Sequence, residues 1–254
     1  MTFHDQWITF PAGIAIATVS SLTGIGGGIL WAPFFLLALK ANPHEAIVLS
    51  LLIQIFGQGS GAYANHRLKK VDWHLVRLFC FYAIPGVFLG SFMSNMIPGK
   101  NLALFLGIMC MVAAFAFLLV PEEYGDEGRT RISKDEARKF WWAPFFSSFL
   151  AGLLSIGIGN WLVPILNTKV RLKMSSSIAN VLGIMFIVGI VGSLVHLVLG
   201  HYPDWHILLW GVPGVFIGGQ IGPRLVSRIN ENHIKEAFIF LLTLTGCHII
   251  FNVY

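Results

Sequence analysis

Apolar residues in this chain fall in long uninterrupted blocks instead of alternating with polar residues. Most of these blocks are near the roughly 20 residues that a helix needs to cross a bilayer core of ~30 Å. The pattern predicts an all-α polytopic membrane protein with the lipid bilayer around it. The blocks without Asp, Glu, Lys or Arg are residues 46–65, 78–99, 101–121, 174–195, 207–223 and the tail from Ala237.

Two further uncharged segments, 6–39 and 140–168, fit neither one crossing nor two. As continuous helices they would be ~50 Å and ~43 Å long. Glycines interrupt each segment near its middle, at 24–28 and 152–159. A re-entrant hairpin, with one arm reaching the midplane and the other returning, accounts for the length if the break is buried in protein or lines a polar cavity. The alternative is a single long tilted helix whose glycines serve close packing.

The chain also contains an internal repeat at a shift of 131 or 132 residues. Three segments recur in the same order: Gly26–Pro33 with Gly157–Pro164, Asp72–His74 with Asp204–His206, and, slightly out of register, Pro85–Gly90 with Pro213–Gly218. The repeat predicts three parts: a first transmembrane repeat over 1–121, a charged linker over 122–139 and a second transmembrane repeat over 140–254.

The placement of the 17 Lys and Arg residues favours hairpins over single crossings. Single crossings would divide these residues about evenly between the two faces. With hairpins, each half has three full crossings, the halves are inverted repeats, and all basic residues except Lys40 and Lys100 share one face. The positive-inside rule then makes the linker cytoplasmic and places both termini on the outer side of the membrane.

Composition narrows the function classes. Charged residues make up 11% of the chain, against about a quarter in soluble domains. The net charge of +5 is typical of basic cytoplasmic loops and predicts no nucleic-acid partner. Cys80, Cys110 and Cys247 lie in separate apolar blocks as small buried residues. No P-loop, His-Glu-x-x-His, Cys pair or Gly-x-Ser-x-Gly is present, so we expect no enzyme, cofactor or metal site.

Broken helices near the midplane of inverted repeats hold the substrate in secondary transporters. A helix that begins inside the membrane presents free N–H groups and its positive dipole end, which attract a small anion without a buried Lys or Arg. We expect the second arms to begin just after Gly28 and Gly159. The candidate substrate-binding residues are Ser21, Thr23, Gly26, Gly27, Gly28, Gln54, Gln58, Ser155, Gly157, Gly159, Asn160, Ser177 and Asn180. Hydrogen bonding between helices is the alternative role for each polar side chain alone.

Glu45, His196 and His248 are candidates for proton coupling, since they lie at or within helix ends and histidine changes charge near neutral pH. A structural role is the alternative for each histidine. Asp72 and Asp204 are expected to cap or orient helices. No carboxylate is expected at mid-membrane, which argues against a sodium site built on Asp or Glu.

The paired Gly-rich breaks, Gly24–Gly28 before Trp31-Ala32-Pro33 and Gly152–Gly159 before Pro164, resemble those of the TauE/SafE (sulfite exporter) family. The Val71–Trp73 and Pro203–Trp205 turns and the Pro-Gly-x-x-x-Gly helices after them are similar to the family's later motifs, so the resemblance spans the chain. It implies transport of sulfur-containing anions such as sulfite, or of organosulfonates, across a bacterial inner membrane. Ile158 and Asn160 depart from a glycine triplet, so the two breaks need not contact a ligand equally.

The sequence thus predicts a secondary carrier that moves a small anion by alternating access, and the resemblance implies a sulfur-containing anion such as sulfite, sulfoacetate or isethionate. Proton coupling is one option for the driving force, and a homodimer is one option for the assembly. An anion-selective channel is the alternative function, because a pore can also be lined by helix N-termini.

Overall fold

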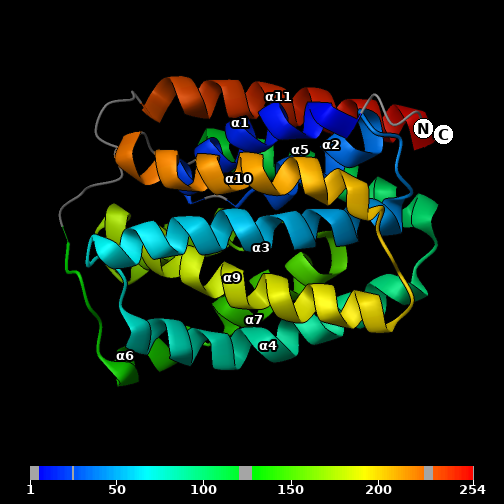
Figure 1. Cartoon of the computed structure of the whole chain (residues 1–254). Coiled ribbons are helices and arrows are strands. Elements are labelled where there is room, and N and C mark those ends of the chain that lie inside the picture. The colour runs from blue at the N-terminus through cyan, green and yellow to red at the C-terminus, as the bar shows by residue number, and fades with distance from the viewer. Residues whose placement is uncertain (1–5, 25, 120–127, 226–230, 254) are drawn as a thin grey trace.

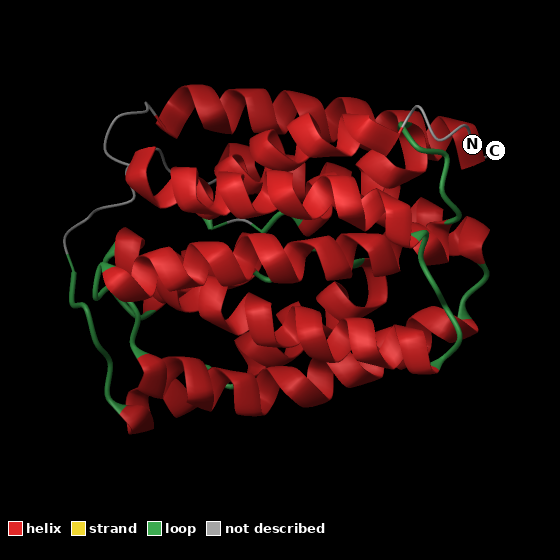
Figure 2. Ribbon diagram, in the orientation of Figure 1, coloured by secondary structure: helices red, strands yellow, loops and turns green. Residues whose placement is uncertain are grey.

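The computed structural model describes residues 6–24, 26–119, 128–225 and 231–253, and no strand occurs among them. Long helices dominate (Figures 1 and 2). They are α3 (Pro43–Arg67), α4 (Trp73–Met96), α5 (Gly99–Leu119), α9 (Met174–Val198), α10 (Trp205–Leu225) and α11 (Glu231–Val253). Four of them, α3, α4, α5 and α9, contain stretches long and apolar enough to cross a membrane. The all-α polytopic membrane fold is confirmed.

The segment that opens each half is a broken pair of helices. The first pair consists of α1 (Thr9–Thr23) and α2 (Gly28–Leu37), and a 3-10 turn at Gln6–Ile8 precedes it. The second pair consists of α7 (Trp142–Leu154) and α8 (Gly159–Pro164). The short α6 (Lys134–Arg138) precedes α7, and a π-helical turn at Ile165–Lys169 follows α8. The second arms therefore begin at Gly28 and Gly159, within a residue of the predicted positions. The single long helix considered for these segments does not form.

Left-handed residues end the first arm of each pair. Gly24 has a φ of +70° and its N–H donates to the Ser20 carbonyl oxygen at 2.8 Å. Ser155 has a φ of +58° and its N–H donates to the Ala151 carbonyl oxygen at 2.8 Å. Glycine adopts this C-cap conformation freely. Serine does so at a steric cost that surrounding contacts must offset, and such residues cluster at functional sites.

Each helix pair returns to the end of the bundle from which it started. Gln6, just before α1, donates to Asp204 at 2.8 Å, and the Asp204 N–H lies 3.4 Å from Glu45 Oε1 at the start of α3. At the opposite end, the Arg129 side chain binds the Val170 carbonyl after α8 and the Glu136 carboxylate before α7. Figure 1 shows both returns, the first at the right and the second at the left.

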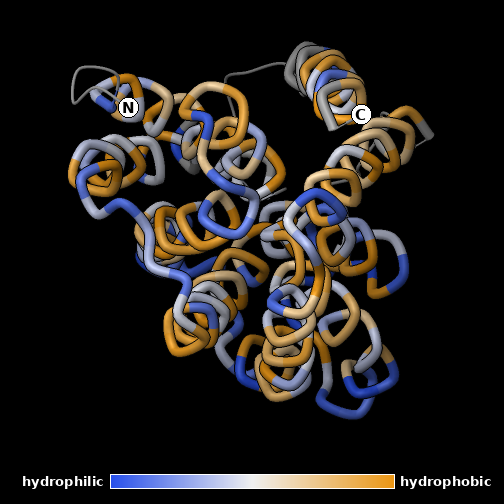
Figure 3. Tube along the Cα trace, turned by 90° about the vertical axis from the view of Figure 1, so that its right-hand side faces the viewer, coloured by the Kyte–Doolittle hydropathy of each residue, from blue (hydrophilic) through white to orange (hydrophobic). Residues whose placement is uncertain are grey.

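Helices of the first half pack mainly on helices of the second. α1 lies against α10, α4 against α7, α3 against α9 and α5 against α11. Figure 3 shows the bundle viewed along its helices. Glycines of the Pro-Gly-x-x-x-Gly segments allow close approach: a Cβ on Gly90 would lie 3.0 Å from Leu153 N of α7, and one on Gly218 2.9 Å from Thr18 N of α1.

The inverted orientation of the halves and the boundaries at 121 and 139 stay predictions. Part of the predicted linker, 122–127, lies outside the described residues. So do Arg228 and the side chain of Lys235, two of the basic residues used to predict the topology.

Asp72 and Asp204 cap α4 and α10, as predicted. Asp72 Oδ1 accepts from the His74 N–H and Asp204 Oδ1 from the His206 N–H, both at 3.0 Å. Burial opposes ionisation of Asp204, but the backbone N–H and imidazole of His206 and the Gln6 amide together lower the pKa of Asp204 below its ordinary value.

Candidate functional site

The two helix breaks meet in the interior of the bundle. A Cβ on Gly28 would overlap the carbonyl oxygen of Ser155. Gly26 has a φ of +88°, and a Cβ on it would lie 2.9 Å from the Cα of Gly157. Only glycine permits this backbone approach, because any larger side chain would separate the breaks. The ends of α1 and α7 and the starts of α2 and α8 are thereby gathered in one place.

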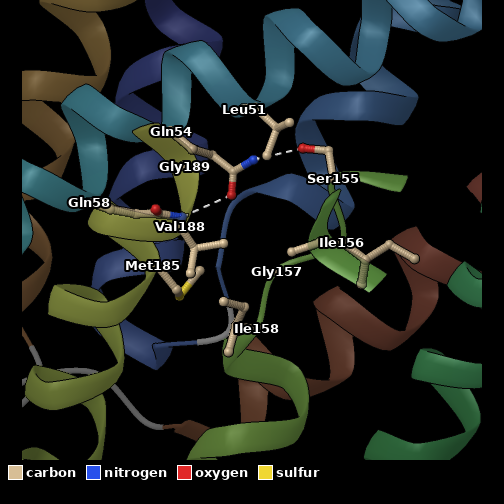
Figure 4. Close-up of a pocket in the computed structure, with 11 residues that line it drawn as sticks. Leu51, Gln54, Gln58, Ser155, Ile156, Gly157, Ile158, Met185, Val188 and Gly189 are labelled. Carbon is tan, nitrogen blue, oxygen red and sulfur yellow. Dashed lines mark hydrogen bonds between the residues drawn. The ribbon is translucent and has the colours of Figure 1, made fainter. Parts of the chain in front are cut away.

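A column of polar side chains on α3 faces this meeting point. Ser50, Gln54 and Gln58 follow one another at intervals of four residues and therefore share a helix face. Ser155 Oγ donates to Ser50 Oγ at 2.8 Å, and Gln54 Nε2 lies 3.0 Å from Ser155 Oγ. Gln58 Nε2 donates to Gln54 Oε1 at 2.8 Å. These hydrogen bonds, two of them drawn in Figure 4, join the centre of α3 to the second break.

The Gln54 amide also reaches the first break. A Cβ on Gly28 would lie 2.9 Å from Gln54 Nε2, so the amide stands beside the start of α2. Gln54 is only 6% exposed and also donates to the Ser50 carbonyl at 2.8 Å. One neutral side chain thus bonds to the second break and lies beside the first.

Two small cavities adjoin Gln54 and Gln58. One lies toward the second break and is lined by Ser155–Ile158 together with Met185, Val188 and Gly189 of α9 (Figure 4). The other lies toward the first break and is lined by Ser20, Ser21, Gly27 and Trp31. Each has about 10 Å³ of water-accessible space, enough for about one water. The site is therefore closed in this structure, and an oxyanion fits only after helices separate.

The described residues that line the two cavities include no charged side chain. Hydrogen-bond donors here are amides and hydroxyls, and the start of α2 adds backbone N–H groups and a positive dipole end. Donors without a fixed charge suit an anion that must bind and also leave. A cation would find only carbonyl, amide and hydroxyl oxygens and no carboxylate.

The sequence matches the family model described as "Sulfite exporter TauE/SafE" over residues 9–249. The chain belongs to this family. A probable membrane transporter protein of Bacillus subtilis, YunE, is 27% identical over 94% of this chain and 95% of its own length. A probable membrane transporter protein of Haemophilus influenzae is 24% identical over 92% and 94%. MamO of Magnetospirillum gryphiswaldense, also a probable membrane transporter protein, is 23% identical over 89% of this chain and 42% of its own length. No solved structure matches.

The family match confirms the resemblance seen in the Gly-rich breaks. TauE/SafE proteins are membrane transporters and not enzymes, so this chain is a multi-pass membrane protein with a transport role and a small-molecule substrate. The glycine motifs behind this resemblance have a structural role, because the two breaks touch at Gly26 and Gly28.

The structure brings most of the predicted site residues together. Ser21 and Gly27 line the cavity toward the first break, Ser155 and Gly157 line the other, and Gln54 and Gln58 line both. Gly26 and Gly28 form the contact between the breaks. The side chain of Thr23 lies outside the described residues.

Four predicted residues lie elsewhere than on the two cavities. Gly159 opens α8 and Asn160 follows it, buried, with no hydrogen-bond partner for either polar atom among the described residues. Asn180 Oδ1 accepts from the Asp72 N–H at 2.7 Å, which ties α9 to the turn before α4. Ser177 Oγ is buried without a described partner. Their roles in binding stay predictions.

The proton-coupling candidates are not at the cavities either. Glu45 interacts with the Asp204 N–H at the end of the bundle where α3 begins. His196, near the end of α9, lies 3.0 Å through Nε2 from the Gly152 carbonyl oxygen of α7. His248 lies on an exposed face of α11.

Sequence reasoning missed Ser50, whose hydroxyl joins Gln54 to Ser155. The spacing could have identified Ser50, since it precedes Gln54 by the same four residues that separate Gln54 from Gln58 and therefore lies on the same helix face. Trp31 and Met185 were also missed. No local pattern marks them, because apolar side chains line a cavity or fill a core according to how distant helices pack.

Proposed function

We propose that this TauE/SafE protein is a secondary carrier for small anions, chiefly sulfur-containing oxyanions or organosulfonates such as sulfite, sulfoacetate and isethionate. The observation that carries the proposal is the contact between the breaks at Gly28 and Ser155 beside the Gln54 amide. Two helix breaks that meet among neutral donors form a place where an anion can be held without a permanent counter-charge.

Recognition in this proposal comes from backbone N–H groups at the breaks and from the amides of Gln54 and Gln58. A helix N-terminus in a low-dielectric interior attracts negative charge. The buried Asn160 side chain, which has no described partner, supports this role because its amide is free to donate to a ligand near the start of α8. Ser21, Thr23, Ser155, Ser177 and Asn180 are proposed to assist.

Transport is proposed to proceed by alternating access. The two cavities on either side of Gln54 and Gln58 are too small for an oxyanion in the closed form, so each side must open in turn. The cross-packing of α1 on α10 and α7 on α4 supports a pair of inverted repeats, in which each broken pair moves with a helix of the other half. Proton coupling is proposed as the energy source.

The proposed setting is a bacterial inner membrane with the linker in the cytoplasm and the termini outside. Basic residues then gather on the cytoplasmic face, where they attract or release the anion and change its rate of arrival more than its affinity. An anion channel is the competing function.

Counterflow in proteoliposomes tests the proposal. Vesicles loaded with unlabelled anion should transiently concentrate the radiolabelled form from outside, at a rate that saturates with concentration. Sulfite, sulfate, thiosulfate, taurine, isethionate and sulfoacetate should be compared, with protein-free vesicles as the control. Flux that neither saturates nor shows counterflow would support a channel, and no flux of any of these anions would overturn the assigned substrate class.

A further inference from the structure

Three histidines from separate parts of the chain gather where α3 begins and α9 ends. The rings of His44 and His201 stack, with centroids 4.7 Å apart and planes 2° from parallel. The ring centroid of His196 lies 6.1 Å from that of His201. His201 Nε2 is also 2.7 Å from Asn95 Oδ1 at the end of α4. These contacts form a short row of imidazoles that runs inward from a half-buried ring, His201, to a buried one.

His196 is the inner member of this row and touches α7. Its side chain is 0% exposed, and Nε2 lies 3.0 Å from the Gly152 carbonyl oxygen, three residues before Ser155. A carbonyl oxygen only accepts, so Nε2 carries the hydrogen and Nδ1 is the bare nitrogen. Nδ1 is buried without a partner among the described residues. A buried acceptor without a partner is unfavourable, and this one is free to take up a proton.

Unpartnered hydroxyls occur on the helices around His196. Ser193 stands three residues earlier on α9, and Ser91 and Ser94 lie on α4, which packs against α9. Their three Oγ atoms are buried without described partners. A Cβ on Gly152 would lie 2.9 Å from Ser91 Oγ, so the Ser91 hydroxyl reaches the segment of α7 that His196 binds. Ordered water commonly satisfies such groups.

Burial opposes a positive charge on His196, whereas the ends of two helices favour one. The ring belongs to the last turn of α9, and its partner Gly152 belongs to the last turn of α7. Carbonyl groups at a helix C-terminus carry partial negative charge and stabilise a cation. Protonation of Nδ1 would therefore add charge where two C-termini converge, beside the second break.

Among the described residues, the titratable groups that face His196 are those of the row itself, His44 from α3 and His201 from the turn before α10. α4 contributes the neutral Asn95, and the neighbouring segment of α7 has no titratable residue. At the same end, Glu45 and Asp204 are linked through the Asp204 N–H, and His206 binds Asp204.

We propose that His196 binds the proton that moves with the anion, and that His44 and His201 pass this proton between His196 and water. The inference rests on the proposed carrier function. A proton from water joins the outer rings and moves to Nδ1 of His196, while the Nε2 hydrogen stays on the Gly152 carbonyl. The ring then carries one positive charge, which offsets one negative charge of the anion, and it becomes neutral again when the proton leaves.

Imidazole signals in the isotope-labelled full chain in lipid nanodiscs test the proton site without a substrate. His196→Gln retains an amide N–H for the Gly152 carbonyl but cannot be protonated. Its spectrum should lack one signal that titrates in the wild type between pH 4 and 8, and His201→Gln should alter the titration of that signal. His206→Gln, at the same end but outside the row, should leave it unchanged. A His196 signal that stays neutral across this range would overturn the proposal.

Proteoliposome flux tests the coupling. Labelled isethionate is the probe, because a sulfonate does not titrate in this range, with sulfoacetate used if isethionate is not exchanged. In the wild type and in His206→Gln, an imposed pH gradient should accelerate net flux. In His196→Gln this acceleration should be lost while anion-for-anion exchange, which needs no net proton movement, persists.

Retained acceleration in His196→Gln would reject His196 as the coupling residue and leave the carrier function standing. Absence of exchange in the wild type would instead reject the carrier function, and the imidazole titration would still decide whether His196 binds a proton. If His196→Gln does not insert into the membrane, His201→Gln provides the second variant. In this variant an imposed pH gradient should accelerate net flux less than it does in the wild type. An unchanged response in His201→Gln would exclude it from the route.

Discussion

The amide of Gln54 lies 3.0 Å from the hydroxyl of Ser155, a residue 101 positions further along the chain. Gln54 occupies the middle of α3, and Ser155 is the left-handed residue that ends α7. This bond makes the second break part of the same polar cluster as the column on α3. A force that separates α3 from α7 must therefore break it, together with the bond between Ser155 and Ser50.

Gly28→Ala should prevent the breaks from meeting. The added methyl group would overlap the Ser155 carbonyl oxygen and approach Gln54 Nε2 at 2.9 Å, and backbone cannot yield as a flexible side chain can. We expect loss of transport and a lower melting temperature. Gly183→Ala on α9 is the matched control, because its Cβ would meet only the Val76 side chain at 3.4 Å. Transport in proteoliposomes and melting in detergent check both variants. Normal transport by Gly28→Ala would show that the contact is dispensable.

Asp204→Asn should weaken the structure at neutral pH and not in acid. The lowered pKa of Asp204 means that its carboxylate stabilises the folded state above the ordinary pKa of about 3.9. That stability is lost as the pH falls through the lower pKa of the folded state. The melting temperature of the variant should lie below that of the wild type at pH 7, and the gap should close toward pH 3. Asp135→Asn, on the exposed α6, is the control. If the difference in melting temperature between the wild type and Asp204→Asn stayed constant with pH, packing and not the carboxylate charge would explain the loss of stability.

Single cysteines should report opposite sides of the membrane for the two ends of the bundle. Cys80, Cys110 and Cys247 would first be replaced. Lys69→Cys and Lys173→Cys should then react with an impermeant thiol reagent only from the cytoplasm, and Lys100→Cys only from outside. The reason is the predicted gathering of basic residues on the cytoplasmic face. Labelling of Lys69→Cys and Lys100→Cys from the same side would rule out the inverted arrangement.

Much of this fold could be predicted from the sequence because membranes make length and charge informative. The lengths of the uncharged apolar blocks predicted the six long helices, because an apolar helix must match the bilayer thickness. The glycine-interrupted segments 6–39 and 140–168, which fit neither one crossing nor two, predicted the broken pairs. Asp72 and Asp204 were recognisable as caps from the turn residues beside them. These features depend on neighbours along the chain.

The contacts of the candidate site were less predictable. Whether Asn180 faces a cavity or the Asp72 N–H depends on how α9 is rotated against α4, which composition does not encode. The stacking of His44 on His201 likewise requires two segments that are 157 residues apart in the sequence to meet. Single polar residues in apolar helices indicate an interior partner without identifying it.

The most direct test of the central claim is the affinity for a labelled anion such as sulfite, measured in parallel at low and high salt for the wild type, Gln54→Ala, Asn65→Ala and Arg171→Ala. Asn65 is a buried amide on the same helix, and among the described residues its side chain donates only to the Gly61 carbonyl of its own helix, at 3.0 Å. Its variant therefore controls for loss of a buried amide.

Loss of one neutral hydrogen bond to a charged ligand costs about 1.5–3 kcal/mol, which is roughly 10- to 150-fold in affinity. The account predicts this loss for Gln54→Ala at both salt concentrations and near-normal affinity for Asn65→Ala. For Arg171→Ala it predicts near-normal affinity at high salt and at most a small, salt-dependent change at low salt. If Arg171→Ala alone abolished binding at every salt concentration while Gln54→Ala bound normally, an ion pair would carry recognition and the central claim would be wrong.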